Sequence, residues 1–417
     1  MRNNDPVKRP SRFYDFHEIF PMRELLQERL DVTNKSRSNI FNWRGQFTPQ
    51  FVDYILEEFA TNASAVIDPF CGSGTVLLEA ASRNIAGFGI ELNPAAYAMA
   101  KFSTLALLDL RQRLELSRQI ESHINSTVRT FGGLPLWNES SDYRAKAANL
   151  LNFARTLLDK SETKKQTLLS TLLLFEAEST RCGDLLPVIR RSHQKLTEQL
   201  VGLPRLAVSP QIFLCDARLA AKVVPVECDF LLTSPPYINV FNYHQNHRAI
   251  VELLGFDILS VARCEIGSNR KNRGNRFRTV VQYCLEMERA LTAFNQILKN
   301  SGYAIMILGR ESNVRGVPFK NGELVYRIAT EGGLFALESQ HERSFTNRFG
   351  TNIVEDILVF RKAETATASN VARTIAGDAL QEGLRVAEKK VVRDIEDAIN
   401  NLDQIPESPI QDRTPIL

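Results

Sequence analysis

The sequence predicts an α/β protein with a mostly parallel, doubly wound sheet, a C-terminal antiparallel strand and a helical insertion. Short apolar runs alternate with amphipathic segments of helical period in two parts of the 417-residue chain. A glycine-rich turn separates the first predicted strand from the helix after it. The region between the two parts is rich in Leu, Ala and charged residues and poor in glycine, which is typical of packed helices.

The composition, 44% hydrophobic and 24% charged with a net charge of +3, is that of a globular protein. No apolar run approaches the roughly 20 residues that cross a bilayer, and the N-terminus lacks the apolar core of a signal peptide. Six cysteines without CxxC spacing indicate neither a zinc site nor a disulfide framework. We therefore expect a cytoplasmic protein with no membrane partner and no metal.

Changes of pattern along the chain divide it into five regions. We expect an N-terminal arm (1–40), the first part of the main domain (41–104), the helical insertion (105–205), the second part of the main domain (206–362), and a linker, helix and loose tail (363–417). Strands are expected at 65–67, 87–91, 211–214, 229–232, 303–308 and 355–360, the last in a hairpin with 336–343. Helices are expected at 51–59, 75–82, 109–128, 142–159, 164–177, 280–299 and 378–401.

A glycine loop, Asp68-Pro-Phe-Cys-Gly-Ser-Gly-Thr75, follows the first strand and opens a helix. Gly72 and Gly74 allow the backbone to approach a ligand closely. The helix N-terminus after them offers unpaired amides to an anion such as a carboxylate. The spacing fits neither GxGxxG nor GxxxxGK[ST], so dinucleotides and triphosphates are disfavoured as ligands.

Acidic residues stand at the ends of three predicted strands: Asp68, Glu91 and Asp216. A carboxylate in the position of Glu91 can accept hydrogen bonds from both hydroxyls of a ribose. Asp216 could accept from the amino group of an adenine. Together with the glycine loop, these acids predict a site for a nucleoside-containing cofactor.

A second motif, Thr233-Ser-Pro-Pro-Tyr237, follows a later apolar strand. Its two prolines fix φ near −65° and remove two backbone donors. The carbonyl groups of Ser234 and Pro235 can therefore point at a ligand without competing amides. The motif predicts a rigid loop that ends in an aromatic ring.

The two motifs, in this order, resemble those of the S-adenosylmethionine-dependent amino methyltransferases of DNA, which modify N4 of cytosine or N6 of adenine. The resemblance covers about 43–94 and 216–361, and it implies a Rossmann-like methyltransferase fold. It implies that Phe70, Gly72 and Gly74 line the methionine end of the cofactor, that Glu91 binds the ribose and that Asp216 lies by the adenine. The expected cofactor-binding residues are Phe47, Thr48, Pro49, Asp68, Phe70, Gly72, Gly74, Thr75, Glu91 and Asp216.

The chemistry expected at the second motif is direct attack by an exocyclic amine. Such an amine is a weak nucleophile, and acceptors aimed at its N–H bonds stabilise the positive charge that develops on it. Ser234 Oγ and the Pro235 carbonyl are the expected acceptors, and Tyr237 offers a face on which a flipped base can stack. The expected catalytic residues are Ser234, Pro235, Pro236 and Tyr237. The family resemblance favours N4 of cytosine because a serine begins this motif, with N6 of adenine as the alternative. Attack at carbon 5 is disfavoured, because no cysteine lies in this motif.

A basic stretch from Arg263 to Arg278 holds six cations and one acid, with glycine, asparagine and serine between them, and it predicts a mobile loop. Beside a site that handles bases, contact with DNA phosphates is the favoured role. The expected contacts are Arg270, Lys271, Arg273, Arg276 and Arg278. The helical insertion could equally grip DNA or only pack against the sheet.

The function expected from these features is methylation of double-stranded DNA in a prokaryotic restriction-modification or other defence system, with the protein held at the nucleoid through DNA. A cognate restriction endonuclease encoded nearby is a candidate partner. Two alternatives remain: an RNA methyltransferase acting on guanine or adenine, and a catalytically silent nucleic-acid-binding subunit. The segment before Phe41 is too short for a separate RNA-binding domain, and the intact Gly72, Glu91 and Ser234 disfavour a silent subunit.

Overall fold

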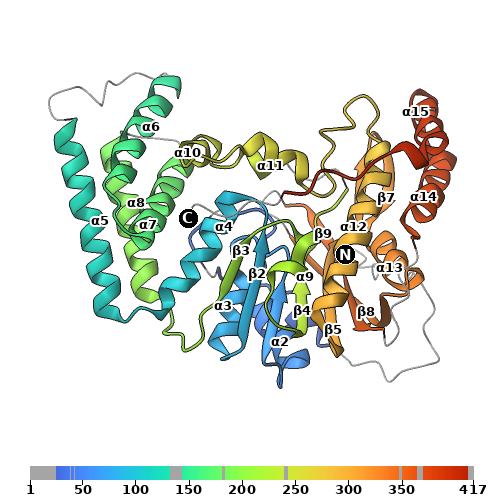
Figure 1. Cartoon of the computed structure of the whole chain (residues 1–417), viewed down its shortest axis with the longest axis horizontal. Coiled ribbons are helices and arrows are strands. Elements are labelled where there is room, and N and C mark those ends of the chain that lie inside the picture. The colour runs from blue at the N-terminus through green and yellow to red at the C-terminus, as the bar shows by residue number, and fades with distance from the viewer. Residues whose placement is uncertain are drawn as a thin grey trace, which may run out of the picture.

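The computed structural model describes residues 25–37, 39–41, 43–131, 143–180, 184–238, 243–346, 350–363 and 370–411. Its centre is a seven-stranded sheet with the order β3-β2-β1-β4-β5-β9-β8 (Figure 1). The strands are β1 (Ala65–Asp68), β2 (Ala86–Glu91), β3 (Gln211–Leu214), β4 (Cys228–Thr233), β5 (Leu298–Gly309), β8 (Phe335–Thr346) and β9 (Asn352–Lys362). Strands β1 to β5 pair in parallel, and β9 is antiparallel to both β5 and β8. The predicted fold class and the predicted hairpin are confirmed.

The strand order reverses between β1 and β4, and this reversal determines where a ligand can bind. Strand β1 pairs with β2 on one side and with β4 on the other. Connections therefore leave the carboxyl ends of β1 and β4 in opposite directions, and in open α/β sheets ligands bind in the crevice at such a reversal. Asp68 and Thr233 lie at these two ends, and Glu91 lies at the carboxyl end of the neighbouring strand β2.

Both faces of the sheet are covered, as a parallel sheet requires. In β4, Phe230 and Leu232 face the core under α2 (Pro49–Phe59) and α3 (Thr75–Ser82). Leu231 faces the opposite core, against α12 (Arg278–Ile297). This alternation is the period of two that a strand imposes on its side chains.

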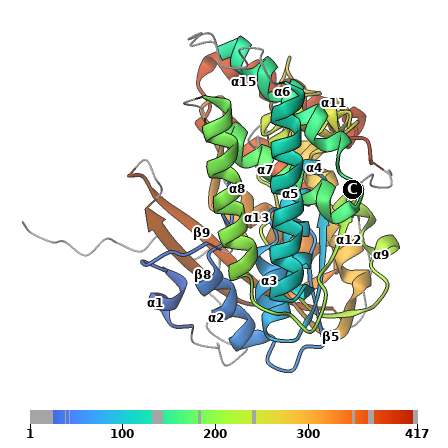
Figure 2. The same ribbon diagram turned by 90° about the vertical axis from the view of Figure 1, so that its left-hand side faces the viewer.

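The helical insertion forms a bundle at the β3 side of the sheet (Figures 1 and 2). Its helices are α5 (Leu110–Thr130), α6 (Tyr143–Asp159), α7 (Lys164–Ser179) and α8 (Leu185–Gly202). The bundle shares one apolar core with α4 (Pro94–Lys101), α10 (Arg248–Leu253) and α11 (Ile258–Cys264). The insertion therefore packs against the protein, and a role in gripping DNA stays a prediction.

Arg113, whose exposure is 4%, ties the two ends of the insertion together. Its guanidinium donates to the carbonyls of Ala106 (2.8 Å) and Leu108 (2.8 Å) where the chain enters the bundle. It also donates to the carbonyls of Leu203 and Pro204, the latter at 2.9 Å, where the chain leaves. The predicted boundaries at 105 and 205 lie beside these carbonyls.

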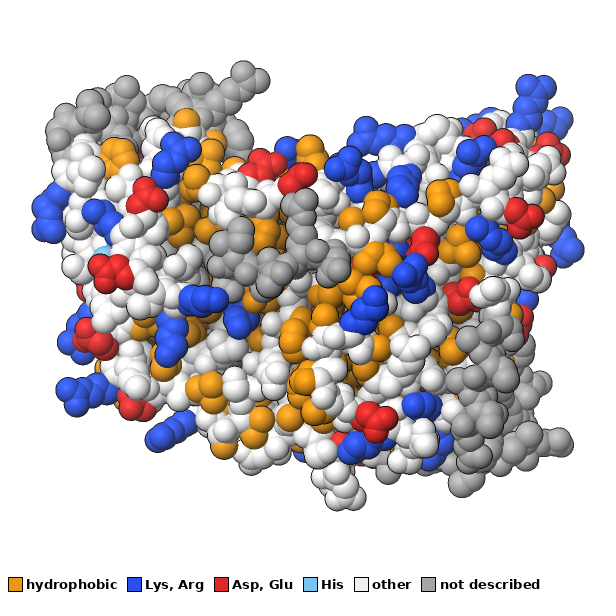
Figure 3. Space-filling view, in the orientation of Figure 1, with side chains coloured by type: hydrophobic (Ala, Val, Ile, Leu, Met, Phe, Trp, Pro, Cys, Tyr) orange, Lys and Arg blue, Asp and Glu red, His pale blue; other side chains and the backbone are white. Residues whose placement is uncertain are grey.

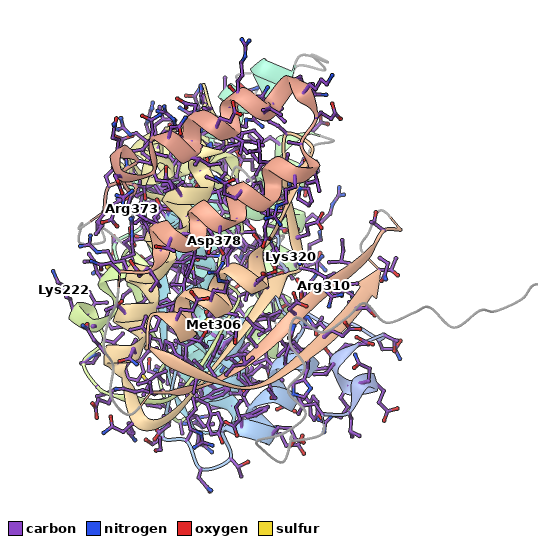
Figure 4. The ribbon with its side chains drawn as sticks, turned by 90° about the vertical axis from the view of Figure 1, so that its right-hand side faces the viewer. Lys222, Met306, Arg310, Lys320, Arg373 and Asp378 are labelled. Carbon is purple, nitrogen blue, oxygen red and sulfur yellow. The ribbon has the colours of Figure 1, made fainter. Side chains whose placement is uncertain are left out.

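The C-terminal region differs from the prediction. Instead of one helix over 378–401 it forms two, α14 (Ala372–Val386) and α15 (Lys389–Asn400), which pack outside α12 and α13 (Asn321–Glu331). Figure 4, viewed from the right-hand side of Figure 1, shows Asp378 on α14, where it accepts from Arg327 of α13 at 2.8 Å, and Met306 on β5 behind them. The predicted linker at the start of 363–417 falls largely on residues 364–369, which lie outside the described residues.

The tail predicted to be loose is packed, with Ile405 3% and Ser408 2% exposed. The basic loop predicted to be mobile is also held in place. The amide of Gly267 donates to Glu286 (2.9 Å), and the side chain of Asn275 donates to Asp397 (2.8 Å). Glu286 lies on α12, the helix that follows the loop, and Asp397 lies on α15, far along the chain, so the composition of the loop alone could not reveal these attachments.

A small hairpin of β6 (Glu311–Val314) and β7 (Val317–Lys320) was not predicted. Its two-residue turn places Arg315 at φ 53° and Gly316 at φ 94°. None of the helices in the described segments is long and apolar enough to cross a membrane.

Gly89 allows β2 to pack closely on α3 and the glycine loop, and this leads to a first prediction. A Cβ at Gly89 would lie 2.5 Å from Leu77 Cδ1 and 3.0 Å from Cys71 Sγ. We expect Gly89→Ala to lower the free energy of unfolding by about 1–3 kcal/mol, measured by urea denaturation. Gly202→Ala is the control, because nothing lies within 4 Å of its added Cβ. An equal effect of the two substitutions would contradict the prediction.

Candidate active site

A buried hydrogen bond joins the ends of the two central strands. Asp68, 2% exposed at the end of β1, accepts from Thr233 Oγ1 at the end of β4 (2.6 Å). The same carboxylate oxygen accepts from the Phe70 amide (3.1 Å). The glycine loop and the Ser-Pro-Pro-Tyr loop are thus attached to one carboxyl group where they leave the sheet.

The glycine loop bends through Gly72 (φ 51°) and Gly74 (φ 86°), both in the left-handed region. Gly72 donates its amide to Glu91 Oε2 (2.9 Å), and Asn93 donates to Glu91 Oε1 (2.7 Å). These two hydrogen bonds orient the Glu91 carboxylate at the end of β2, beside the glycine loop. This is the residue that the sequence analysis expects to bind the ribose. Thr75, buried, is the first residue of α3, while Phe70 packs edge-on against Phe294 of α12 at 5.9 Å.

The segment before α2 lies on the glycine loop. The Gln46 side chain donates to Ser73 Oγ, and Asn39 Nδ2 donates to the Ser73 carbonyl (3.3 Å). Thr48 is the N-cap of α2, and its buried Oγ1 has no hydrogen-bond partner among the described residues. Of the other two predicted cofactor residues here, Pro49 is the first residue of α2 and Phe47 packs on Phe51 at 5.6 Å. The orphan hydroxyl of Thr48 fits a polar ligand at this edge.

Asp216, 1% exposed, is bound by a neighbouring arginine. Arg218 donates to it through its amide (3.0 Å), Nε (2.9 Å) and Nη2 (2.6 Å). These three donors engage both carboxylate oxygens. The predicted contact of Asp216 with an adenine amino group must therefore share these oxygens with Arg218.

The Ser-Pro-Pro-Tyr loop is held from two sides. The ring of Tyr237 rests on the backbone of Gly309, where an added Cβ would lie 2.7 Å from Cε2. The Tyr237 hydroxyl donates to Glu355 Oε1 (3.4 Å), and a Cβ at Gly267 would collide with the Tyr237 carbonyl oxygen. Pro235 is buried, whereas Ser234, Pro236 and Tyr237 remain half-buried at the surface of the crevice.

Further side chains, outside the residues expected to be catalytic or to bind the cofactor, lie near the two loops. Trp43 stacks on Tyr243 with ring centroids 5.4 Å apart, and its indole lies 3.3 Å from where a Cβ of Gly72 would be. His244, 1% exposed, lies between Glu265 (3.4 Å from Nδ1) and Arg270, which contacts Nε2. Two features of the sequence pointed to these residues: Trp43 stands just before the predicted cofactor segment, and Glu265 is the one acid within the basic stretch.

Three carboxyl groups of this region have raised pKa values. Burial raises the pKa of Asp68 and of Glu91 to about 7 each, against the opposing hydrogen bonds that both accept. Burial also raises the pKa of Glu265, although His244 and Arg270 oppose the shift. The site is therefore a set of buried acids that a cationic ligand would help to ionise. Burial raises the pKa of the Cys71 thiol as well, so this cysteine is not an activated thiolate.

The predicted phosphate contacts separate into two groups. Arg278 pairs with Asp397 of α15 (2.8 Å), Lys271 donates to the Glu407 carbonyl (3.1 Å), and Arg270 turns inward to His244. Arg273 and Arg276 are exposed to solvent. Lys and Arg side chains gather at the upper right of Figure 3, in the region of α12, α15 and the loop before α12. Arg273 and Arg276 are thus the cations of the loop best placed for a polyanion.

The described residues contain no group of three or more His, Cys, Asp or Glu side chains that could hold a metal ion. His244 and His247, close in sequence, have different partners. His247 binds Glu178 of α7 (2.7 Å) and stacks on Phe175 with ring centroids 4.4 Å apart. This contact attaches the bundle to the segment that follows the Ser-Pro-Pro-Tyr loop.

Comparison with known proteins identifies relatives. A model of the DNA methylase family matches residues 6–102, which include the glycine loop and Glu91 but not the Ser-Pro-Pro-Tyr loop. The type II methyltransferase M.BsoBI of Geobacillus stearothermophilus is 22% identical over 349 residues, 65% of this chain and 65% of that protein. M.MjaII of Methanocaldococcus jannaschii is 35% identical over 71 residues, 17% of this chain and 13% of that protein. The chain thus covers less than two thirds of the length of these two relatives.

Among solved structures, an S-adenosylmethionine-dependent methyltransferase of Methanosarcina mazei aligns with 75% of this chain and 98% of its own, at 10% identity and a TM-score of 0.33. The family match and the alignment with M.BsoBI support an amino methyltransferase. S-adenosylmethionine is the cofactor that such an enzyme uses.

The bond between Asp68 and Thr233 leads to a second prediction. A carboxyl group with a raised pKa binds its proton more tightly in the folded state, so stability falls as pH rises from about 4 to 7. Thr233→Val removes a donor that favours the ionised form. We expect it to lower the free energy of unfolding by about 1–3 kcal/mol at pH 8.5 and by less at pH 5.5, where Asp68 is protonated.

Urea denaturation at the two pH values measures this difference. Thr104→Val is the control, since its hydroxyl donates to the Lys101 carbonyl (2.7 Å), which does not titrate. A loss of stability for Thr233→Val that is the same at both pH values would show that Asp68 does not titrate as described.

Proposed function

We propose that this protein is an S-adenosylmethionine-dependent DNA methyltransferase that transfers a methyl group to the exocyclic N4 of cytosine in double-stranded DNA. The observation that carries the proposal is the hydrogen bond between Asp68 and Thr233 (2.6 Å). It joins a glycine loop suited to a nucleoside cofactor to a Ser-Pro-Pro-Tyr loop suited to an amine. A methyl donor and an acceptor amine held by these loops would meet at one edge of the sheet.

The electrostatics of the crevice support a cationic cofactor. S-adenosylmethionine carries a sulfonium and an ammonium group. The carboxyl groups of Asp68, Glu91 and Glu265 lie in or beside the crevice, and burial raises the pKa of each. A cation bound beside these acids would favour their ionised forms and would offset part of the free energy that their burial costs. In the proposal Glu91 binds the ribose, and Thr48 Oγ1 supplies a further polar contact.

The reaction proposed is a direct displacement. The lone pair of the amine attacks the methyl carbon while the carbon–sulfur bond breaks and its electrons return to sulfur. Ser234 Oγ and the Pro235 carbonyl accept hydrogen bonds from the N–H groups of the amine as positive charge develops on its nitrogen. The flipped base stacks on the face of Tyr237 turned away from Gly309. The extra proton then leaves to solvent.

The serine that begins the Ser-Pro-Pro-Tyr motif favours cytosine over adenine, and N6 of adenine is the second candidate. We propose a restriction-modification or other defence role, with a cognate endonuclease as partner. These finer assignments follow the resemblance of the two motifs.

One experiment tests the reaction and the base together. The protein is incubated with S-adenosylmethionine labelled in the methyl group and with genomic DNA or total RNA, and the digested nucleosides are identified. We expect label in N4-methylcytosine from DNA. Label in N6-methyladenine would overturn the choice of base, and label only in RNA would overturn the choice of DNA.

Substitutions in the two loops should separate catalysis from cofactor binding. We expect Ser234→Ala and Tyr237→Ala to lower kcat by about 100-fold or more while the Kd for S-adenosylmethionine stays within about twofold. Gly72→Val should abolish cofactor binding, because its φ of 51° excludes valine and Trp43 lies 3.3 Å from the added Cβ. Calorimetry measures Kd, and unchanged binding by Gly72→Val would refute this map of the site.

The exposed cations of the basic loop should supply part of the DNA affinity. We expect the double substitution Arg273→Ala and Arg276→Ala to reduce the slope of log K against log salt by about 2, with little dependence on DNA sequence. Arg83→Ala is the control, because this exposed arginine ends α3 at the opposite edge of the sheet. The prediction fails if the double variant keeps the slope of the unsubstituted protein.

A further inference from the structure

Arg218 is a buried side chain to which the reaction described above gives no role. Its side-chain exposure is 0%, and it pairs with Asp216, whose side-chain exposure is 1%, at 2.6 Å. Removing one partner of such a buried ion pair is costly, because it leaves an uncompensated charge in the interior. The pair fixes the carboxylate at the end of β3, on the proposed cofactor side of the crevice.

The same guanidinium also binds the C-terminal segment. It donates to the carbonyls of Ser408 and Pro409, each at 2.9 Å, and Nη1 lies 3.4 Å from Glu407 Oε2. Arg373 of α14, labelled in Figure 4, donates to the Ile405 carbonyl at 3.2 Å and so holds the start of this segment. Arg218 additionally donates to the carbonyl of Cys264 (3.3 Å), where the basic loop begins.

Glu286 of α12 is the second centre of this junction. It is 0% exposed and accepts from the amide of Ser408 (2.8 Å), the amide of Gly267 (2.9 Å) and the side chain of Gln282 (2.8 Å). Gly267 lies directly against the carbonyl oxygen of Tyr237. The junction therefore reaches the base side of the crevice through Gly267.

We propose that Arg218 is a positioning residue that, together with the 405–409 segment and Glu286, sets the cofactor side and the base side of the site relative to each other. On the cofactor side it orients Asp216. On the base side the tail and Glu286 hold Gly267 against Tyr237. The inference rests on the proposed function, because it assumes that these two sides bind S-adenosylmethionine and the target base.

The test compares substitutions by calorimetry with S-adenosylmethionine and by turnover on DNA, well below the Tm of each variant. We expect Arg218→Gln to raise the cofactor Kd by about tenfold or more. Arg218→Lys keeps the positive charge but lacks the planar set of N–H donors, so we expect it to restore part of the affinity. Arg327→Gln is the matched control. It also breaks ion pairs, with Glu331 and Asp378, but on helices away from the crevice, so it should lower Tm without changing Kd.

The tail gives a second, independent pair of variants. Ser408→Pro removes the amide that donates to Glu286, whereas Ser408→Ala keeps this amide and removes only the hydroxyl, which lies 3.4 Å from the Cys264 carbonyl and also interacts with Glu286. We expect Ser408→Pro to lower kcat by about tenfold with cofactor Kd nearly unchanged, and Ser408→Ala to retain both.

The results separate this inference from the proposed function. A folded Arg218→Gln protein with unchanged cofactor Kd, or a Ser408→Pro protein with unchanged kcat, would overturn the positioning role. If Arg218→Gln does not fold, Arg218→Lys and the two Ser408 variants decide the question. Failure of the unsubstituted protein to bind S-adenosylmethionine would overturn the proposed function itself.

Discussion

The hydrogen bond from Thr233 to Asp68 is the interaction on which the arrangement of the crevice depends. It lies where the strand order of the sheet reverses, at the ends of β1 and β4. The pairing of β1 with β4 brings the starts of the two loops together, and the hydrogen bond between Asp68 and Thr233 joins them where they turn in opposite directions. One buried carboxyl group, anchored to a hydroxyl, therefore joins the loop proposed to bind the cofactor to the loop proposed to bind the base.

The second constraint is the concentration of buried acids near this bond. Burying carboxyl groups without matching cations costs stability, and the protein bears this cost at Asp68 and Glu91. Asp216 differs, because Arg218 neutralises it. The crevice is therefore acidic where a cation is proposed to bind. One strand away, where the adenine is proposed to lie, the negative charge of Asp216 is neutralised by Arg218.

The sequence was sufficient to predict the sheet and the two motif loops because their signals are local. The apolar runs, Gly72, Gly74 and the paired prolines each restrict the backbone where they occur. What sequence could not predict depends on partners far along the chain. Asp397 restrains a loop that its own residues suggest is mobile, and Arg218 packs a tail that its own residues suggest is loose. Trp43 and Tyr243 became neighbours only in the folded protein.

The single guanidinium of Arg113 that binds both ends of the insertion has a consequence for how such a chain can change over evolutionary time. The chain leaves the bundle beside the point where it entered. The order and connections of the strands can therefore stay the same whatever the length of the insertion. Lineages could lengthen, shorten or exchange the bundle without rethreading the catalytic core. The limit on such exchange is the apolar surface of α4, α10 and α11, which any replacement would have to cover.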